Sequence, residues 1–123
     1  MIETLIVDDA PLNLKLLSVL LAANGYAVRT AASAEQALEV LASYHPRLLL
    51  VDIRLPGMDG LSLVRLLRSK PEHATTVIVA VTASAMKGDE EIALAAGCDS
   101  YVTKPVNTRT LPAHLAECLQ KRP

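Results

Sequence analysis

Five polar residues of this chain each follow, or lie one residue beyond, an apolar strand-like run. Asp8 and Asp9 follow Thr4–Val7, Asp52 follows Leu48–Val51, Thr82 follows Val77–Val81, and Lys104 follows Tyr101–Thr103. Short, continuous apolar runs are typical of buried strands in a parallel sheet, which is covered on both faces. In open parallel sheets, ligands bind at the carboxyl ends of the strands. We therefore expect three carboxylates, a hydroxyl and an ammonium to meet at one edge of one sheet.

The charges of this group indicate a metal-assisted phosphoryl transfer. Two carboxylates about 4 Å apart repel by roughly 4 kcal/mol at an effective dielectric constant near 20, and either a raised pKa or a bound cation relieves the repulsion. Oxygen-only ligands favour a hard ion such as Mg²⁺. Asp8 and Asp9 are adjacent, so one can ligate directly and the other through water. Asp52 is then a nucleophile that accepts the phosphoryl group, while Lys104 and Thr82 bind its oxygens.

Each of these residues also has an ordinary structural interpretation. An aspartate or threonine after a strand is often a helix N-cap, and Asp9 could be no more than that. A Lys-Pro pair is often part of a turn. It is their joint occurrence at the ends of four separate strands that favours a functional site.

The elements that must position the site alternate regularly along the chain. We expect strands at 4–7, 26–29, 48–51, 77–81 and 101–103, and helices from about 10 to 23, 34 to 45, 61 to 70, 86 to 96 and 108 to 119. This alternation predicts an α/β fold, a doubly wound parallel sheet of five strands with five helices and right-handed crossovers. The interval from Asp8 to Asp52 is about twice that of one βα unit, so the second strand adds nothing to the site. A strand order of 2-1-3-4-5 explains that omission.

Composition limits the other classes of function. The chain has 123 residues, of which 51% are hydrophobic and 20% charged, as expected of one globular domain spanning residues 1–123. Its 12 basic and 13 acidic residues give no sign of a nucleic-acid surface. No apolar stretch approaches the roughly 20 residues that span a bilayer, and no leader precedes the first strand, so we expect a cytoplasmic protein. Cys98 and Cys118 are expected to be core thiols.

Four sequence segments carry a resemblance to a known family. They are Val7-Asp8-Asp9, the run from Val51 to Gly60, Val81-Thr82-Ala83 and Lys104-Pro105. With these segments, essentially the whole chain resembles the receiver domains of two-component response regulators, which have a CheY-like, flavodoxin-like fold. The segments 85–89 and 96–101 resemble single-domain regulators of the DivK type, or receivers attached to hybrid kinases.

The resemblance implies a role for each site residue. Asp52 is the phosphorylation site, and it receives the phosphoryl group from a histidine kinase or a histidine phosphotransfer protein. Mg²⁺ (or Mn²⁺) is bound by Asp8, Asp9, Asp52 and the backbone carbonyl of Arg54. Thr82 and Lys104 contact the phosphoryl group, Tyr101 is the switch aromatic, and Pro105 follows a cis peptide bond. Such a domain is a signalling phosphoacceptor rather than an ordinary enzyme, although it supports its own phosphotransfer and autodephosphorylation.

The expected output is a change of surface. A phosphoryl group adds nearly two negative charges, which draw Thr82 inward and allow Tyr101 to rotate into the vacated space. The surface of the fourth helix, fifth strand and fifth helix then changes and controls a downstream protein. We expect no direct DNA binding, no membrane attachment, and a monomer or weak dimer.

Two further hypotheses concern rates and docking. Arg54 and Ser84 stand two residues beyond Asp52 and Thr82, where they flank the path of an attacking water and tune the lifetime of the aspartyl phosphate. The donor's histidine-bearing helices are expected to dock on a face made of Asn13, Leu14, Leu17, Pro105 and Val106. For the leucines, an ordinary core position is an equally good interpretation.

Four alternatives remain open at this stage. A flavin-binding flavodoxin-like protein needs phosphate donors after the first strand, where this chain has two anions. An aspartate-nucleophile phosphatase needs a second acid two residues beyond the nucleophile, where this chain has Arg54. The third is a receiver that binds partners without being phosphorylated. The fourth is a receiver fragment of a larger hybrid kinase or response regulator.

Overall fold

The computed structural model describes residues 1–83 and 88–122, and within them five parallel strands form a single sheet. The strands are β1 (Ile2–Val7), β2 (Tyr26–Ala31), β3 (Leu48–Val51), β4 (Val77–Thr82) and β5 (Ser100–Thr103). Their order is β2-β1-β3-β4-β5, and every neighbouring pair is parallel. The predicted fold class and strand order are therefore confirmed.

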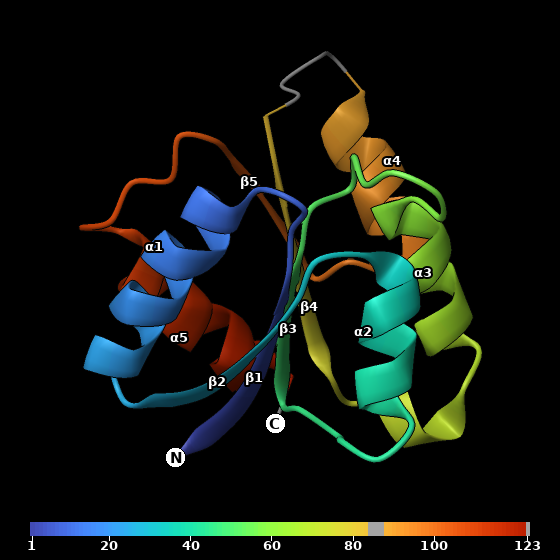
Figure 1. Cartoon of the computed structure of the whole chain (residues 1–123), viewed down its shortest axis with the longest axis horizontal. Coiled ribbons are helices and arrows are strands. Elements are labelled where there is room, and N and C mark those ends of the chain that lie inside the picture. Colours follow the sequence, from blue (N-terminus) through green and yellow to red (C-terminus); the bar gives the residue numbers. More distant parts are fainter. Residues whose placement is uncertain (84–87, 123) are drawn as a thin grey trace.

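Helices cover both faces of the sheet. They are α1 (Pro11–Ala23), α2 (Ala34–Leu41), α3 (Gly60–Arg68), α4 (Asp89–Ala96) and α5 (Leu111–Lys121), with a short 3₁₀ helix η1 (Pro71–His73) between α3 and β4. Helices α1 and α5 lie on one face, whereas α2, α3 and α4 lie on the other (Figure 1). Within the described residues, no helix combines the length and the apolar character needed to cross a membrane.

The core consists of two apolar layers, one on each side of the sheet. Successive strand residues point to opposite faces, so β3 contributes Leu48 and Leu50 to the layer under α1 and α5, and Leu49 and Val51 to the opposite layer. All four side chains are buried. This burial on both faces explains why the strands are continuous apolar runs rather than alternating ones.

Several element boundaries differ from the sequence prediction; α2, for example, ends at Leu41 rather than near residue 45. Helix α5 begins at Leu111 rather than Thr108, because Thr110 N–H and Leu111 N–H both bond to the carbonyl of Asn107 in a preceding turn. The 3₁₀ helix η1 was not predicted, because the pattern indicates only that the preceding helix ends before Pro71. The predicted start of the alanine-rich helix at Met86 lies outside the described residues, and α4 is described from Asp89 onward.

The burial pattern of α1 corrects one part of the docking hypothesis. Leu17 is only 2% exposed and packs in the core under α1 and α5, so its predicted role as a docking residue is wrong. Leu14 is half-buried against the same layer. Leu12, Leu16 and Val19, at helical spacing, are instead 84%, 45% and 61% exposed. These three residues form an apolar stripe on the outward face of this helix.

Candidate functional site

The sheet hydrogen bonding continues one residue beyond the strands and places the site residues in register. Asp8 N–H donates to Ala31 O over 3.1 Å, and Asp52 N–H donates to Val7 O over 2.9 Å. At the other side of the site, Lys104 N–H donates to Thr82 O over 2.8 Å. These bonds fix the backbones of Asp8, Asp52 and Lys104 at the same edge of the sheet, as the sequence predicted.

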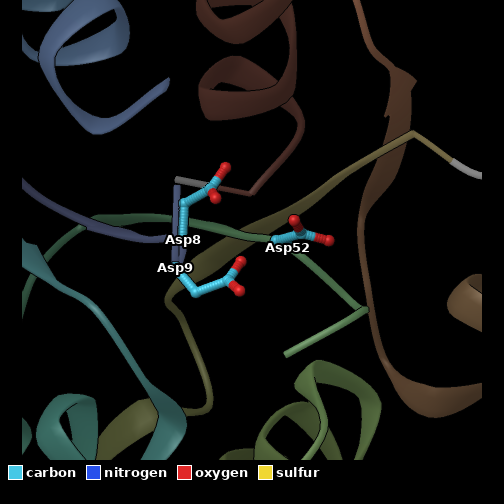
Figure 2. Close-up of side chains that lie close together, drawn as sticks. All are labelled: Asp8, Asp9 and Asp52. Atoms are coloured by element: carbon cyan, nitrogen blue, oxygen red, sulfur yellow. The ribbon is translucent and has the colours of Figure 1, made fainter. Parts of the chain in front are cut away.

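The three carboxylates lie close together at this edge. Asp8, Asp9 and Asp52 each offer an oxygen, and these oxygens all lie within 4.8 Å of one another (Figure 2). Asp8 and Asp52 are 2% and 6% exposed, whereas Asp9 is exposed. A backbone N–H group donates to the Oδ1 atom of each buried carboxylate. Ala10 N–H donates to Asp8 Oδ1 and Arg54 N–H donates to Asp52 Oδ1, both over 2.9 Å.

Lys104 bridges the two buried carboxylates. Its Nζ donates to Asp8 Oδ2 and to Asp52 Oδ2, both over 2.8 Å. Burial alone would lower the pKa of Lys104, but the hydrogen bonds to Asp52 and Asp8 outweigh it and raise the pKa above the ordinary 10.5. Because the pKa of Lys104 is higher in the folded state, the pairing stabilises the fold at neutral pH. This stabilisation is lost only as the pH rises through the raised, folded-state pKa.

The donor set fits a hard divalent cation. Three carboxylates and one ammonium leave a formal charge of −2 at the site, which a divalent ion neutralises. All the side-chain ligands are oxygens, and their mutual distances allow some to ligate directly and one through water. Asp9 is the exposed member, so the cluster is open to solvent on its side.

The other predicted site residues that the structure describes belong to β4, β5 and the loops that follow β3 and β5. Thr82 is the fully buried last residue of β4, and Tyr101 is half-buried on β5. Burial raises the pKa of the Tyr101 phenol, and Asp89 and Glu90 raise it further. The Lys104–Pro105 peptide bond is cis. Arg54 is exposed in the loop after Asp52, and Ser84 lies outside the described residues.

Sequence reasoning missed one structural requirement of the site, at Gly60. A Cβ atom on this residue would lie 2.3 Å from Asp52 O and 2.6 Å from Ile53 Cα, so only glycine allows α3 to begin this close to the Asp52 backbone. Gly60 N–H also donates to Ile53 O over 3.2 Å. Gly60 ends one of the sequence segments that carry the family resemblance, but its role depends on a backbone approach that spacing does not reveal.

Comparison with known proteins agrees with this geometry. The response regulator receiver domain family matches residues 4–116. This chain belongs to that family. It is 41% identical over 105 residues to the polar-differentiation response regulator DivK of Brucella ovis, covering 85% of each chain. Receiver domains act in phosphorelay signalling, and the assignment argues against the flavin-binding and phosphatase alternatives.

Solved structures of receiver domains share the whole architecture. A putative response regulator from Chloroflexus aurantiacus superimposes with a TM-score of 0.92 at 33% identity, covering 97% of this chain and 98% of that one. The receiver domain of a sensor histidine kinase from Pseudomonas aeruginosa gives a TM-score of 0.82 at 34% identity, covering 98% and 96%. The latter structure holds a magnesium ion coordinated in its active site cleft.

Proposed function

We propose that this receiver domain accepts a phosphoryl group on Asp52 from a histidine kinase or a histidine phosphotransfer protein, in a Mg²⁺-dependent reaction. The observation that carries the proposal is the bridge from Lys104 to Asp8 and Asp52 beside the exposed Asp9. In the transfer, a carboxylate oxygen of Asp52 forms the new P–O bond as the P–N bond of the donor phosphohistidine breaks. The electron pair of that bond leaves with the imidazole.

The residues of this chain have distinct tasks in the reaction. Asp8, Asp9, Asp52 and the carbonyl of Arg54 would hold the Mg²⁺ ion, which when bound neutralises charge on the transferring oxygens. The Lys104 ammonium already lies 2.8 Å from Asp52 Oδ2 and would bind a phosphoryl oxygen. Thr82 would bind another oxygen through its hydroxyl. Arg54 and Ser84 would set the lifetime of the aspartyl phosphate by limiting access of water.

The proposed output is a change at the α4-β5-α5 surface. Thr82 and Tyr101 belong to neighbouring strands, with Ala80 opposite Tyr101 and Thr82 opposite Thr103. A shift of Thr82 toward the phosphoryl group would leave space into which the half-buried Tyr101 can move, favouring one of two packings. A downstream protein that binds this surface would then read the phosphorylated state.

One specific observation keeps the larger-protein alternative open. Two of the matching structures are receiver domains of histidine kinases, from Pseudomonas aeruginosa and Syntrophus aciditrophicus. A receiver fragment of a hybrid kinase would use the same site and the same chemistry.

The proposed function is tested with a small-molecule donor. With acetyl phosphate and Mg²⁺, we expect a mass gain of about 80 Da, which is the mass of one phosphoryl group. The gain should disappear when EDTA removes the metal. Absence of labelling together with absence of Mg²⁺ binding would contradict the proposal.

A second prediction concerns the face on which the donor docks. Leu12, Leu16 and Val19 form an exposed apolar stripe on α1, which begins two residues after Asp9. Exposed apolar patches commonly mark protein interfaces. The test uses a histidine kinase that phosphorylates the wild-type protein. With that donor, we expect replacement of all three residues by Gln to slow phosphotransfer about tenfold, equivalent to about 1.4 kcal/mol.

The controls separate docking from chemistry. Labelling of the triple variant by acetyl phosphate should equal that of the wild type, because this small donor needs no docking surface. Ile92→Gln on α4, which removes an equally apolar side chain that is 50% exposed, should leave kinase-dependent transfer unchanged. Equal transfer rates for the triple variant and the wild type would place the donor elsewhere.

A further inference from the structure

The loop that carries Asp52 and Arg54 contacts a helix that contributes no residue to the acidic site. This β3–α3 loop (residues 52–59) passes the beginning of α2, where Met58 N–H donates to Glu35 Oε2 over 3.1 Å. The bond to Met58 N–H is also the main reason that the pKa of Glu35 is lowered. The contact joins residues 23 positions apart, so it is a tertiary contact and not part of a local turn.

The local backbone supports this contact from both sides. Glu35 is the second residue of α2, whose start is fixed by the Ser33 hydroxyl accepting from Gln36 N–H over 3.0 Å. On the loop side, Gly57 has φ +73°, and a Cβ atom there would lie 2.9 Å from Glu35 Oε2. The loop therefore approaches the carboxylate closely because its residue before Met58 is a glycine.

Hydrogen bonds thus restrain the β3–α3 loop at its start, in its middle and at its end. At its start, Arg54 N–H bonds to Asp52 Oδ1, and at its end Asp59 caps α3 by accepting from Ser62 N–H over 2.7 Å. Glu35 holds its middle from a separate helix. A loop restrained in this way loses little further conformational freedom when one of its backbone carbonyls becomes a metal ligand.

We infer that Glu35 is a positioning residue for the metal site, acting through Met58 N–H to hold the β3–α3 loop in the conformation that presents the carbonyl of Arg54. The inference rests on the proposed function, because it assumes that this carbonyl is a ligand. Among the described residues, the hydrogen bond of the Glu35 side chain goes to Met58 N–H and not to the acidic cluster. Its contribution is to preorganise the loop, as groups beyond the direct ligands do at other metal sites.

The test measures Mg²⁺ binding to the full chain by titration calorimetry. Loss of a supporting group outside the direct ligands commonly weakens metal binding about 10- to 100-fold. Because Glu35 acts on a loop rather than on a ligand side chain, we expect Glu35→Ala to weaken Mg²⁺ binding by less, about fivefold. Glu35→Gln should stay within about twofold of the wild type, since its amide oxygen still accepts from Met58 N–H. Glu39→Ala, which changes another exposed glutamate of α2, should have no effect.

One readout does not depend on the metal-loaded protein, and a double-mutant cycle adds an independent measurement. In metal-free protein, the Met58 amide should exchange with solvent faster in Glu35→Ala than in the wild type. Gly57→Ala should weaken Mg²⁺ binding in the wild-type background and less so in the Glu35→Ala background, where the added Cβ no longer meets the carboxylate.

The outcomes that overturn the inference differ from those that overturn the proposed function. Equal Mg²⁺ affinity for Glu35→Ala and the wild type would show that Glu35 has no positioning role. An equal loss of affinity in Glu35→Gln and Glu35→Ala would also contradict the inference, because it would indicate an effect of the Glu35 charge rather than of the Met58 contact. A wild-type protein that binds no Mg²⁺ would instead overturn the proposed function, and the positioning role with it.

Discussion

In the Asp52→Asn variant, we expect the rate of phosphorylation by acetyl phosphate and Mg²⁺ to fall at least about 100-fold below that of the wild type. This corresponds to an increase of at least about 2.7 kcal/mol in activation free energy. The amide is neutral and a poor nucleophile, so the new P–O bond cannot form. Its side-chain oxygen can still accept from Arg54 N–H, which in the native protein donates to Asp52 Oδ1. The loss should therefore be chemical, and intact-protein mass spectrometry measures it directly.

A matched control lies in the same loop. Asp59→Asn also replaces an aspartate by its amide, but Asp59 is the exposed N-cap of α3, and asparagine caps helices equally well. This variant should be labelled as the wild type is. Persistent labelling of Asp52→Asn, or a phosphoryl group mapped to Asp8 or Asp9 in the wild type, would show that the acceptor has been assigned wrongly.

Much of the site could be predicted because parallel strands translate sequence position into spatial position. Once the apolar runs were assigned as buried strands, the residue after each run had to lie at the same edge of the sheet. The hydrogen bonds from Asp52 N–H to Val7 O and from Lys104 N–H to Thr82 O show this register directly. The prediction needed only strand identity and order.

The features that escaped prediction depend on which side of an element faces the core. Helix α1 carries leucines on both its buried and its exposed side, so its pattern predicts a helix without indicating that Leu17 is buried and Leu16 is exposed. The contact between Glu35 and Met58 and the hydrogen bonds of Arg68 depend on loops meeting across long sequence distances. Local periodicity carries no signal for such contacts.

Arg68 is the clearest of these cases, and its replacement by Met should cost about 1–3 kcal/mol of unfolding free energy, the range for leaving hydrogen-bond acceptors unsatisfied while Asp99 keeps its ion pair with Arg122. Its side chain is 16% exposed and pairs with Asp99 over 2.8 Å. The guanidinium also donates to four backbone carbonyls, at 2.9 Å to Gly97, 2.8 Å to Thr76, 3.2 Å to His73 and 3.5 Å to Ala74. Methionine keeps the aliphatic bulk but leaves these acceptors without their donor. Urea unfolding measures the loss.

A control variant comes from the same helix, α3, and a phosphorylation assay distinguishes an effect on stability from an effect on the acidic site. Arg65→Met removes an exposed arginine of α3 and should change the unfolding free energy by less than about 0.5 kcal/mol. Asp99 precedes β5 and also accepts from Ile78 N–H near the start of β4, so this network lies at the end of the sheet opposite Asp52. Folded Arg68→Met should therefore still be labelled by acetyl phosphate. A loss below about 1 kcal/mol would mean that water replaces the guanidinium at these carbonyls, and that the network contributes little to the stability of the fold.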